Sequence, residues 1–169
     1  MTTLQYRTID SPVGPLTLAG AGSTLVHLRM NDQTHEPDSS RWQPAAPGAF
    51  AGIVEQLDSY FAGDLTDFDV DLTLQGTDFQ LRVWSALRTI PYGETRSYGE
   101  IATQIGAPGA SRAVGLANGR NPISIIVPCH RVVGSTGSLT GYGGGLHRKQ
   151  FLLGLEFNRH AAAQPALFG

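Results

Sequence analysis

The stretch Pro128-Cys129-His130-Arg131 holds the side chains best suited to chemistry in this sequence. Cys129 is the only cysteine among 169 residues, and an imidazole and a guanidinium follow it directly. Such neighbours favour the thiolate, which is the nucleophilic form of cysteine. A carboxylate that orients the imidazole would complete a cysteine–histidine–acid relay, and Glu156 is the only acid after Glu100. The spacing therefore predicts an activated thiol without choosing a reaction, and a small buried cysteine without reactivity is the alternative.

The segments around this stretch should position it. Residues 123–127 are apolar and lie between two prolines, so we expect a buried strand that ends just before Cys129. Because successive side chains of a strand point to opposite faces, a direct contact between Cys129 and His130 is not expected. A glycine-rich loop over 134–145 leads into a last helix, with Phe151, Leu152 and Leu155 facing inward. The alanine-rich tail from Phe157 is expected to fray.

Upstream, the second half of the chain shows a mainly helical pattern. Thr77 and Gln80 form a capping-box pattern for a helix that reaches Leu87. A short helix over 97–105, a turn over 107–110 and a further helix capped by Ser111 follow. Helix, short turn and helix in this order indicate a helix-turn-helix.

The first half carries little visible chemistry. Phe50 to Phe61 form an apolar stripe at helical spacing, and residues 31–48 are polar and rich in proline, as in a loop. Alternating patterns predict strands at 4–8, 16–19, 25–30 and 68–74. We therefore expect an α+β protein with a small N-terminal α/β unit (residues 1–75) and a mainly helical C-terminal domain (residues 76–169).

Charge divides the chain at the same place. Residues 1–75 carry three arginines against ten acids, a net charge of −7, whereas residues 76–169 carry nine basic residues against four acids, a net charge of +5. The basic set is almost entirely arginine, which suits bidentate contacts to phosphates and bases. The split indicates that the second half faces a nucleic acid, and chance clustering on a solvated surface is the alternative.

Composition favours an ordinary globular protein, with 41% hydrophobic and 15% charged residues. No apolar run is long enough to cross a bilayer, and the N-terminus lacks the pattern of a secretory signal. A single cysteine excludes an internal disulfide, which suits a reducing compartment. We therefore expect a cytoplasmic protein without a membrane partner.

The second half resembles the O6-alkylguanine-DNA alkyltransferases, also called methylated-DNA–protein-cysteine methyltransferases. The resemblance is strong over about residues 77–156, and the first half is similar only loosely to the family's N-terminal domain, which is ribonuclease-H-like. It rests on motifs at Tyr92–Tyr98, Arg112–Gly115, Asn121–Pro122, Ile126–Val133, Gly141–Leu146, Lys149 and Leu152–Glu156.

The resemblance implies direct repair of O6-alkylguanine, and of O4-alkylthymine, in double-stranded DNA. In the family the helix-turn-helix enters the minor groove and the damaged nucleotide is flipped into the protein. Arg112 matches the arginine that fills the vacated space in the base stack. Ala113 and Gly115 match small residues that let the helix approach the groove. The alkyl group would move irreversibly to Cys129, so that each molecule reacts once and needs no cofactor.

The family also implies roles for the other matched residues. Glu156 would hold His130, which acts on Cys129 through a water. Tyr98 would donate to guanine N3, and Asn121 would brace the turn between recognition helix and active-site strand. Lys149 matches a lysine near the active site, although a surface role is the alternative. Tyr142 and Gly143 lie in the loop that would wall the base pocket.

Two departures from the family pattern stand out. Many relatives carry serine where this chain has Gly143, so a hydroxyl contact to O6 is lost and only backbone N–H groups could replace it. Some relatives bind zinc in the N-terminal domain, but this half has no cysteine and only His27 and His35. We expect no metal, and a monomer in solution.

Two other classes of function compete with alkyl transfer. A cysteine hydrolase would use Cys129, His130 and Glu156 repeatedly on an acyl substrate. A non-enzymatic sensor would bind alkylguanine without reacting, as relatives that lack the cysteine do. The presence of Cys129 argues against the sensor, and the expected separation of Cys129 from His130 argues against the hydrolase.

Overall fold

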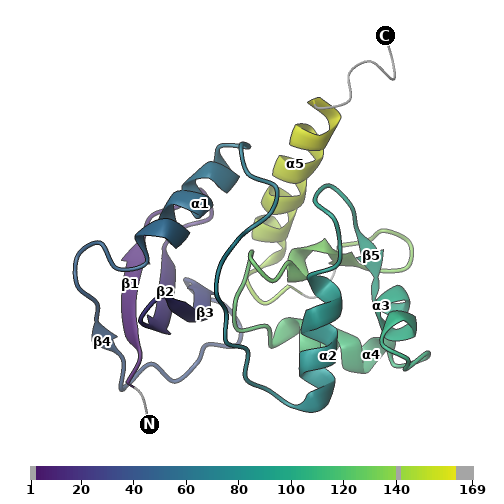
Figure 1. Ribbon diagram of the computed structural model, residues 1–169. Coiled ribbons are helices and arrows are strands. Elements are labelled where there is room, and N and C mark those ends of the chain that lie inside the picture. Colours follow the sequence, from purple (N-terminus) through teal and green to yellow (C-terminus); the bar gives the residue numbers. More distant parts are fainter. Residues whose placement is uncertain (1–2, 140–141, 163–169) are drawn as a thin grey trace.

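The structure is a computed structural model that describes residues 3–139 and 142–162, with the side chains of 160–162 left out. Figure 1 shows the N-terminal sheet on one side, a group of helices on the other, and a long C-terminal helix between them. Gly141, part of the predicted glycine-rich loop, lies outside the described residues, as does the tail from residue 163. The molecule is therefore an α+β protein, as predicted.

The N-terminal half is a four-stranded sheet in the order β3-β2-β1-β4. Strands β1 (Gln5–Ile9), β2 (Leu16–Ala21) and β3 (Thr24–Met30) pair antiparallel, and β4 (Gln43–Pro44) pairs parallel with β1. β2 is the most buried strand of this sheet, and β1 and β3 pair with its two edges. Helix α1 (Ala51–Phe61) buries Ile53, Leu57 and Tyr60 in the same core as the leucines of β2.

Two predictions for this half were wrong in part. β4 lies within the stretch 31–48 that we expected to be only loop. Residues 68–74 form no regular strand, because a single bridge between Leu25 and Leu72 joins them to the sheet. Their side chains nevertheless alternate between half-buried and exposed, which is the pattern the sequence showed. Alternation therefore predicted burial correctly but not the length of the pairing.

The predicted helix-turn-helix is present in the C-terminal half. Helix α2 (Asp78–Leu87) starts with the predicted capping box, and α3 (Tyr98–Gln104) starts with a second one made by Ser97 and Glu100. After a turn, α4 (Ser111–Gly119) follows. Ser111 is not its cap, however, because Ala110 holds that position and no side chain caps the helix. The indole Nε1 of Trp84 donates to the carbonyl of Ala117 at 2.9 Å and joins α2 to α4.

The stretch before Cys129 is a turn rather than the predicted strand. Asn121 explains the difference, since its amide accepts from the Ile123 N–H at 3.0 Å and donates to the Val127 carbonyl at 2.7 Å. These two bonds close residues 121–127 into a compact, buried loop. The loop lies against the N-terminal sheet, where the Leu28 N–H donates to the Pro122 carbonyl at 2.9 Å.

Beyond this loop, Cys129–Arg131 form the short 3₁₀ helix η1. Strand β6 (Val132–Val133) then pairs parallel with β5 (Arg96–Ser97), and helix α5 (Leu146–Ala162) ends the described chain. α5 buries Leu152 but leaves Phe151 41% exposed, so the prediction that Phe151 faces inward was wrong. The helix also continues past Phe157, where fraying was expected.

Candidate active site

Cys129 lies at the first position of η1 and is 4% exposed. Its backbone carbonyl accepts from the Asn118 side chain at 3.3 Å, so the end of α4 fixes the position of the thiol. A small cleft reaches it, lined by Gln33, His35, Asn118, Gly119, Asn121, Ser124, Tyr142, Gly143 and Gly144. The thiol is therefore at the bottom of a narrow opening between the end of α4 and the glycine-rich loop.

The pKa of the Cys129 thiol is raised, whereas the sequence led us to expect neighbours that favour the thiolate. Burial raises the pKa of Cys129, and the Asn121 amide, the Lys149 charge and the Tyr142 hydroxyl oppose this shift. Neither His130 nor Arg131 acts on the thiol in the way their place in the sequence suggested. The free protein thus holds a neutral thiol at neutral pH, and the thiolate must form through a base.

His130 is fully buried and faces Glu156, with 2.6 Å between Nε2 and Oε2. A carboxylate can only accept, so Nε2 carries the proton and Nδ1 keeps its lone pair. Burial lowers the pKa of His130, which favours the neutral imidazole. Within the described part of the chain, Nδ1 has no hydrogen-bond partner. The residue that follows Cys129 in the sequence is therefore a neutral imidazole whose Nδ1 lone pair is unused.

Glu156 is the centre of a buried polar cluster. Arg131 donates to it twice, from Nε at 2.8 Å and from Nη2 at 3.1 Å, and the Tyr60 hydroxyl donates at 2.6 Å. Burial raises the pKa of Glu156, but the hydrogen bonds and charges of His130 and Arg131 outweigh this and lower it to about 2. Arg131 was expected to act on the thiol, and Tyr60 was not predicted as part of the site. Only the tertiary fold brings the Tyr60 hydroxyl of α1 to Glu156 of α5; the two helices are labelled in Figure 1.

Lys149 is fully buried, which excludes the surface role considered above. Its ammonium donates to the Val132 carbonyl at 2.5 Å and lies 6.0 Å from the centre of the Tyr98 ring. Burial lowers the pKa of Lys149 to about 8, and the nearby Cys129 opposes the shift. A buried cation therefore lies close enough to the thiol to stabilise a thiolate.

The Tyr98 side chain, from α3, lies next to Gly115 of α4. A side chain at position 115 would meet the Tyr98 ring at 3.8 Å, which is ordinary contact. Tyr98 is half-buried at the first turn of α3. The Tyr98 ring therefore lies next to α4 at Gly115 and close to the Lys149 ammonium.

The outer face of α4 is exposed, and we call Arg112, Ala113, Leu116 and Arg120 the α4 face. Leu116 is 71% exposed, the highest value among the large hydrophobic side chains described. Leu116 follows Arg112 by one helical turn, and no role was predicted for it from the sequence. Among the described residues, Arg112 and Arg120 form no ion pair, so both guanidinium groups remain available to a partner.

The glycine-rich loop closes the cleft. Tyr142 is buried, and its hydroxyl contacts the Met30 sulfur at 3.8 Å. The Gly143 carbonyl accepts from the Thr34 N–H at 2.8 Å. A Cβ at position 143 would lie 3.5 Å from the Gly119 carbonyl, which is ordinary contact, so the backbone leaves room for a Cβ there.

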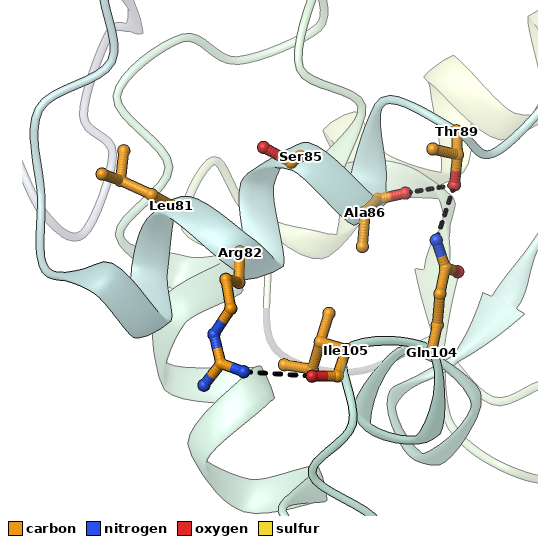
Figure 2. Close-up of a pocket in the computed structure, with 7 residues that line it drawn as sticks. All are labelled: Leu81, Arg82, Ser85, Ala86, Thr89, Gln104 and Ile105. Atoms are coloured by element: carbon orange, nitrogen blue, oxygen red, sulfur yellow. Dashed lines mark hydrogen bonds between the residues drawn. The ribbon is translucent and has the colours of Figure 1, made fainter.

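A second hollow lies between α2 and α3, away from Cys129. Figure 2 shows its apolar floor and two polar bridges across it. Arg82 donates to the Ile105 carbonyl at 3.1 Å, and Gln104 donates to the Thr89 hydroxyl at 3.0 Å. Because these polar groups are already paired, the hollow offers little chemistry, and the cleft at Cys129 is the better candidate.

Comparison with known proteins covers both halves of the chain. Residues 4–74 match the ribonuclease-like domain of 6-O-methylguanine DNA methyltransferase, and residues 78–158 match its DNA binding domain. A curated methylated-DNA–protein-cysteine methyltransferase of Mycobacterium tuberculosis (strain ATCC 25618 / H37Rv) is 70% identical over 165 residues, 98% of this chain and 99% of the relative. The protein of the same name from Mycobacterium leprae (strain TN) is 68% identical over 153 residues, 90% of this chain and 92% of the relative.

Solved structures agree with these relatives. The crystal structure of Mycobacterium tuberculosis OGT in complex with DNA superposes with a TM-score of 0.90 and 72% identity, over 92% of this chain and 94% of that one. The structure of the Mycobacterium tuberculosis O6-methylguanine methyltransferase gives a TM-score of 0.89 at 69% identity, over 99% and 100%. In the part of this chain that the structure describes, no helix is both long and apolar enough to cross a membrane.

Proposed function

This chain belongs to the 6-O-methylguanine DNA methyltransferase family, and from that premise we propose that it repairs O6-alkylguanine in DNA by moving the alkyl group onto Cys129. The observation that carries this proposal is the position of the thiol. It lies at the bottom of a cleft at the end of α4, and the neighbouring imidazole has an unused lone pair on Nδ1. Such a site suits one displacement by sulfur on a base that enters from the α4 side.

The reaction is an in-line displacement at the alkyl carbon. His130 Nδ1 accepts the thiol proton through a water, and the sulfur of Cys129 forms a bond to carbon while the carbon–O6 bond breaks. Tyr98 donates to guanine N3 as the leaving group takes up negative charge. Lys149 stabilises the thiolate. A thioether cannot be displaced by water, so the protein reacts once and needs no cofactor.

The α4 face brings the target base to this site. Arg112 fills the space that the flipped nucleotide leaves in the stack, and Ala113 and Gly115 allow close approach of α4 to the minor groove. Asn121 holds the loop that carries Cys129, through its two bonds to Ile123 and Val127.

The glycine-rich loop forms one wall of the pocket that receives the base. Tyr142 and Gly143 line it, and backbone N–H groups serve O6 in place of a serine hydroxyl. O4-alkylthymine carries its alkyl group on an equivalent exocyclic oxygen, O4, and is a second substrate.

The two halves of the chain have different roles. Residues 1–75 form the support domain, and residues 76–169 bind double-stranded DNA and carry the transfer site. The protein acts in the cytoplasm, a reducing compartment that suits a chain with a single cysteine. It acts as a monomer.

Titration against O6-methylguanine DNA with a labelled methyl group tests this proposal. We expect label to appear on the protein and to stop at one equivalent per chain. Label that never reaches the protein while the DNA is bound would indicate a sensor. Repeated turnover on an acyl ester, again without protein labelling, would indicate a cysteine hydrolase.

A further inference from the structure

Tyr60 connects the N-terminal half to the proposed transfer site. It lies near the end of α1, is fully buried, and donates to Oε2 of Glu156 at 2.6 Å across 96 residues of sequence. The same oxygen lies 2.6 Å from Nε2 of His130. One carboxylate oxygen therefore serves both a tyrosine of the first half and the histidine next to the nucleophile.

We propose that Tyr60 is a positioning residue for alkyl transfer: its hydroxyl fixes the Glu156 carboxylate in the orientation that holds His130. The inference rests on the proposed function and gives the N-terminal half a part in reactivity beyond support. Arg131 donates to the other carboxylate oxygen, Oε1, at 2.8 Å and also to Oε2 at 3.1 Å, so donors from two different elements hold the carboxylate.

The direction of the bond follows from the chemistry of the two groups. An ionised carboxylate only accepts, so the Tyr60 hydroxyl must donate. Burial and the neighbouring Glu156 raise the pKa of Tyr60 well above its usual value, so the hydroxyl keeps its proton throughout the working range. A hydrogen bond to a charged acceptor is stronger than one between neutral groups, especially where water is excluded.

Loss of this donor changes the charge that His130 meets. With Tyr60 present, the negative charge of Glu156 is shared among Tyr60, Arg131 and His130. Without Tyr60, more of that charge acts on His130 and favours the imidazolium, which cannot accept a proton from the thiol. The titratable or charged groups that face the cluster are Tyr60 from α1, Tyr92 from the loop after α2, His130 and Arg131 from η1, and Lys149 and Arg159 from α5.

The test compares two tyrosine-to-phenylalanine variants of the full chain. We expect Tyr60→Phe to lower the single-turnover rate of transfer by roughly three- to tenfold on the acidic side of the pH–rate profile, and by less at neutral pH. The acidic limb of its pH–rate profile should move to higher pH by roughly half to one unit. Affinity for DNA should stay unchanged, because Tyr60 is remote from the α4 face.

Tyr92→Phe is the matched control. The rings of Tyr60 and Tyr92 lie 6.3 Å apart, and the buried Tyr92 hydroxyl has no hydrogen-bond partner among the described residues. Its removal should leave the acidic limb in place. A merely structural effect of Tyr60 would lower stability or the whole profile without moving the limb.

A second variant covers the case in which Tyr60→Phe does not fold. 3-Fluorotyrosine at position 60 keeps the shape and makes the hydroxyl a stronger donor, so the limb should move to lower pH. An unmoved limb in the variant that folds would overturn the inference, while a wild type that still takes up one alkyl group would leave the proposed function standing. A wild type that takes up none would overturn the proposed function instead.

Discussion

Nε2 of His130 and Oε2 of Glu156 lie 2.6 Å apart, and both side chains are closed to solvent. This contact directs Nε2 of the imidazole toward the carboxylate and leaves the other nitrogen, Nδ1, without a hydrogen-bond partner among the described residues. Because Arg131 also binds Glu156, the carboxylate is ionised and the imidazole is neutral. We propose that this pair supplies the base for Cys129, whose own pKa is raised by burial.

Glu156→Gln should destabilise the fold by about 3–5 kcal/mol, because it leaves the buried Arg131 without its counter-charge. Chemical denaturation at pH 7 measures this. Glu94→Gln is the control, since it removes an exposed partner of Arg96 and should cost less than about 1 kcal/mol. Equal effects of the two substitutions would contradict the role given to the buried cluster.

The same carboxylate predicts a pH dependence of stability. The pKa of Glu156 is about 2 in the folded state and 4.5 in its ordinary state. A lowered pKa stabilises the fold fully above the ordinary value, and this contribution is lost as the pH falls toward the folded value. The free energy of unfolding should therefore decrease between about pH 5 and pH 2, and less so in Glu156→Gln.

Lys149→Met should slow transfer while leaving stability nearly unchanged or higher, because it replaces a buried cation with an apolar chain of similar length. The pKa of Lys149 is about 8, so the wild type loses its positive charge as the pH rises through that value. The ratio of wild-type to variant transfer rates should therefore fall over this range. A ratio that is the same from pH 6 to pH 10 would show that the charge of Lys149 does not act on Cys129.

Local signals predicted local structure well in this chain. The capping box at Thr77 and Gln80 was confirmed, as was the alternating burial of residues 68–74. The segment 123–127 was predicted as a strand because its apolar run fits one, but only a single bridge joins Ile123 to β3, and the side chain of Asn121 holds the segment in a turn. Apolar content alone cannot distinguish these two outcomes.

The candidate site could likewise be predicted only in part from the sequence. Cys129, His130 and Glu156 could be selected by residue type, since few residues of each type follow residue 100. Tyr60 could not, because a contact across 96 residues leaves no local pattern. Arg131 was assigned to the thiol by its place in the sequence, whereas the 3₁₀ turn directs it to Glu156.

Arg112→Ala should slow repair of a lesion in duplex DNA far more than reaction with free O6-alkylguanine base. The side chain is exposed at the start of α4 and is assigned to the flipped state, which a free base does not require. Transfer rates on the two substrates give the comparison. Equal losses on both would show that Arg112 instead supports the fold or the site.

DNA binding should weaken with salt despite the net charge of −2. Arg131, Arg148 and Lys149 are used inside the protein, so few cations reach phosphates. We expect the slope of log affinity against log salt to be roughly −2 to −4. Neutralising Arg112 and Arg120 together should make it shallower by roughly two.

Arg88→Gln is the control for this titration, because Arg88 is exposed at the end of α2 and outside the α4 face. It should leave the slope nearly unchanged. Binding that ignores salt, or that survives the double change at Arg112 and Arg120, would mean that the basic half is only a solvated surface.

The intact mass of the protein after incubation with O6-methylguanine DNA tests the central claim most directly. Wild type should gain one methylene equivalent permanently, and peptide mapping should place it on Cys129. Cys129→Ser should gain nothing yet still bind alkylated DNA, because a hydroxyl of similar size is far less ionised than a thiol. An unchanged wild-type mass, or an equal gain in Cys129→Ser, would contradict transfer to Cys129.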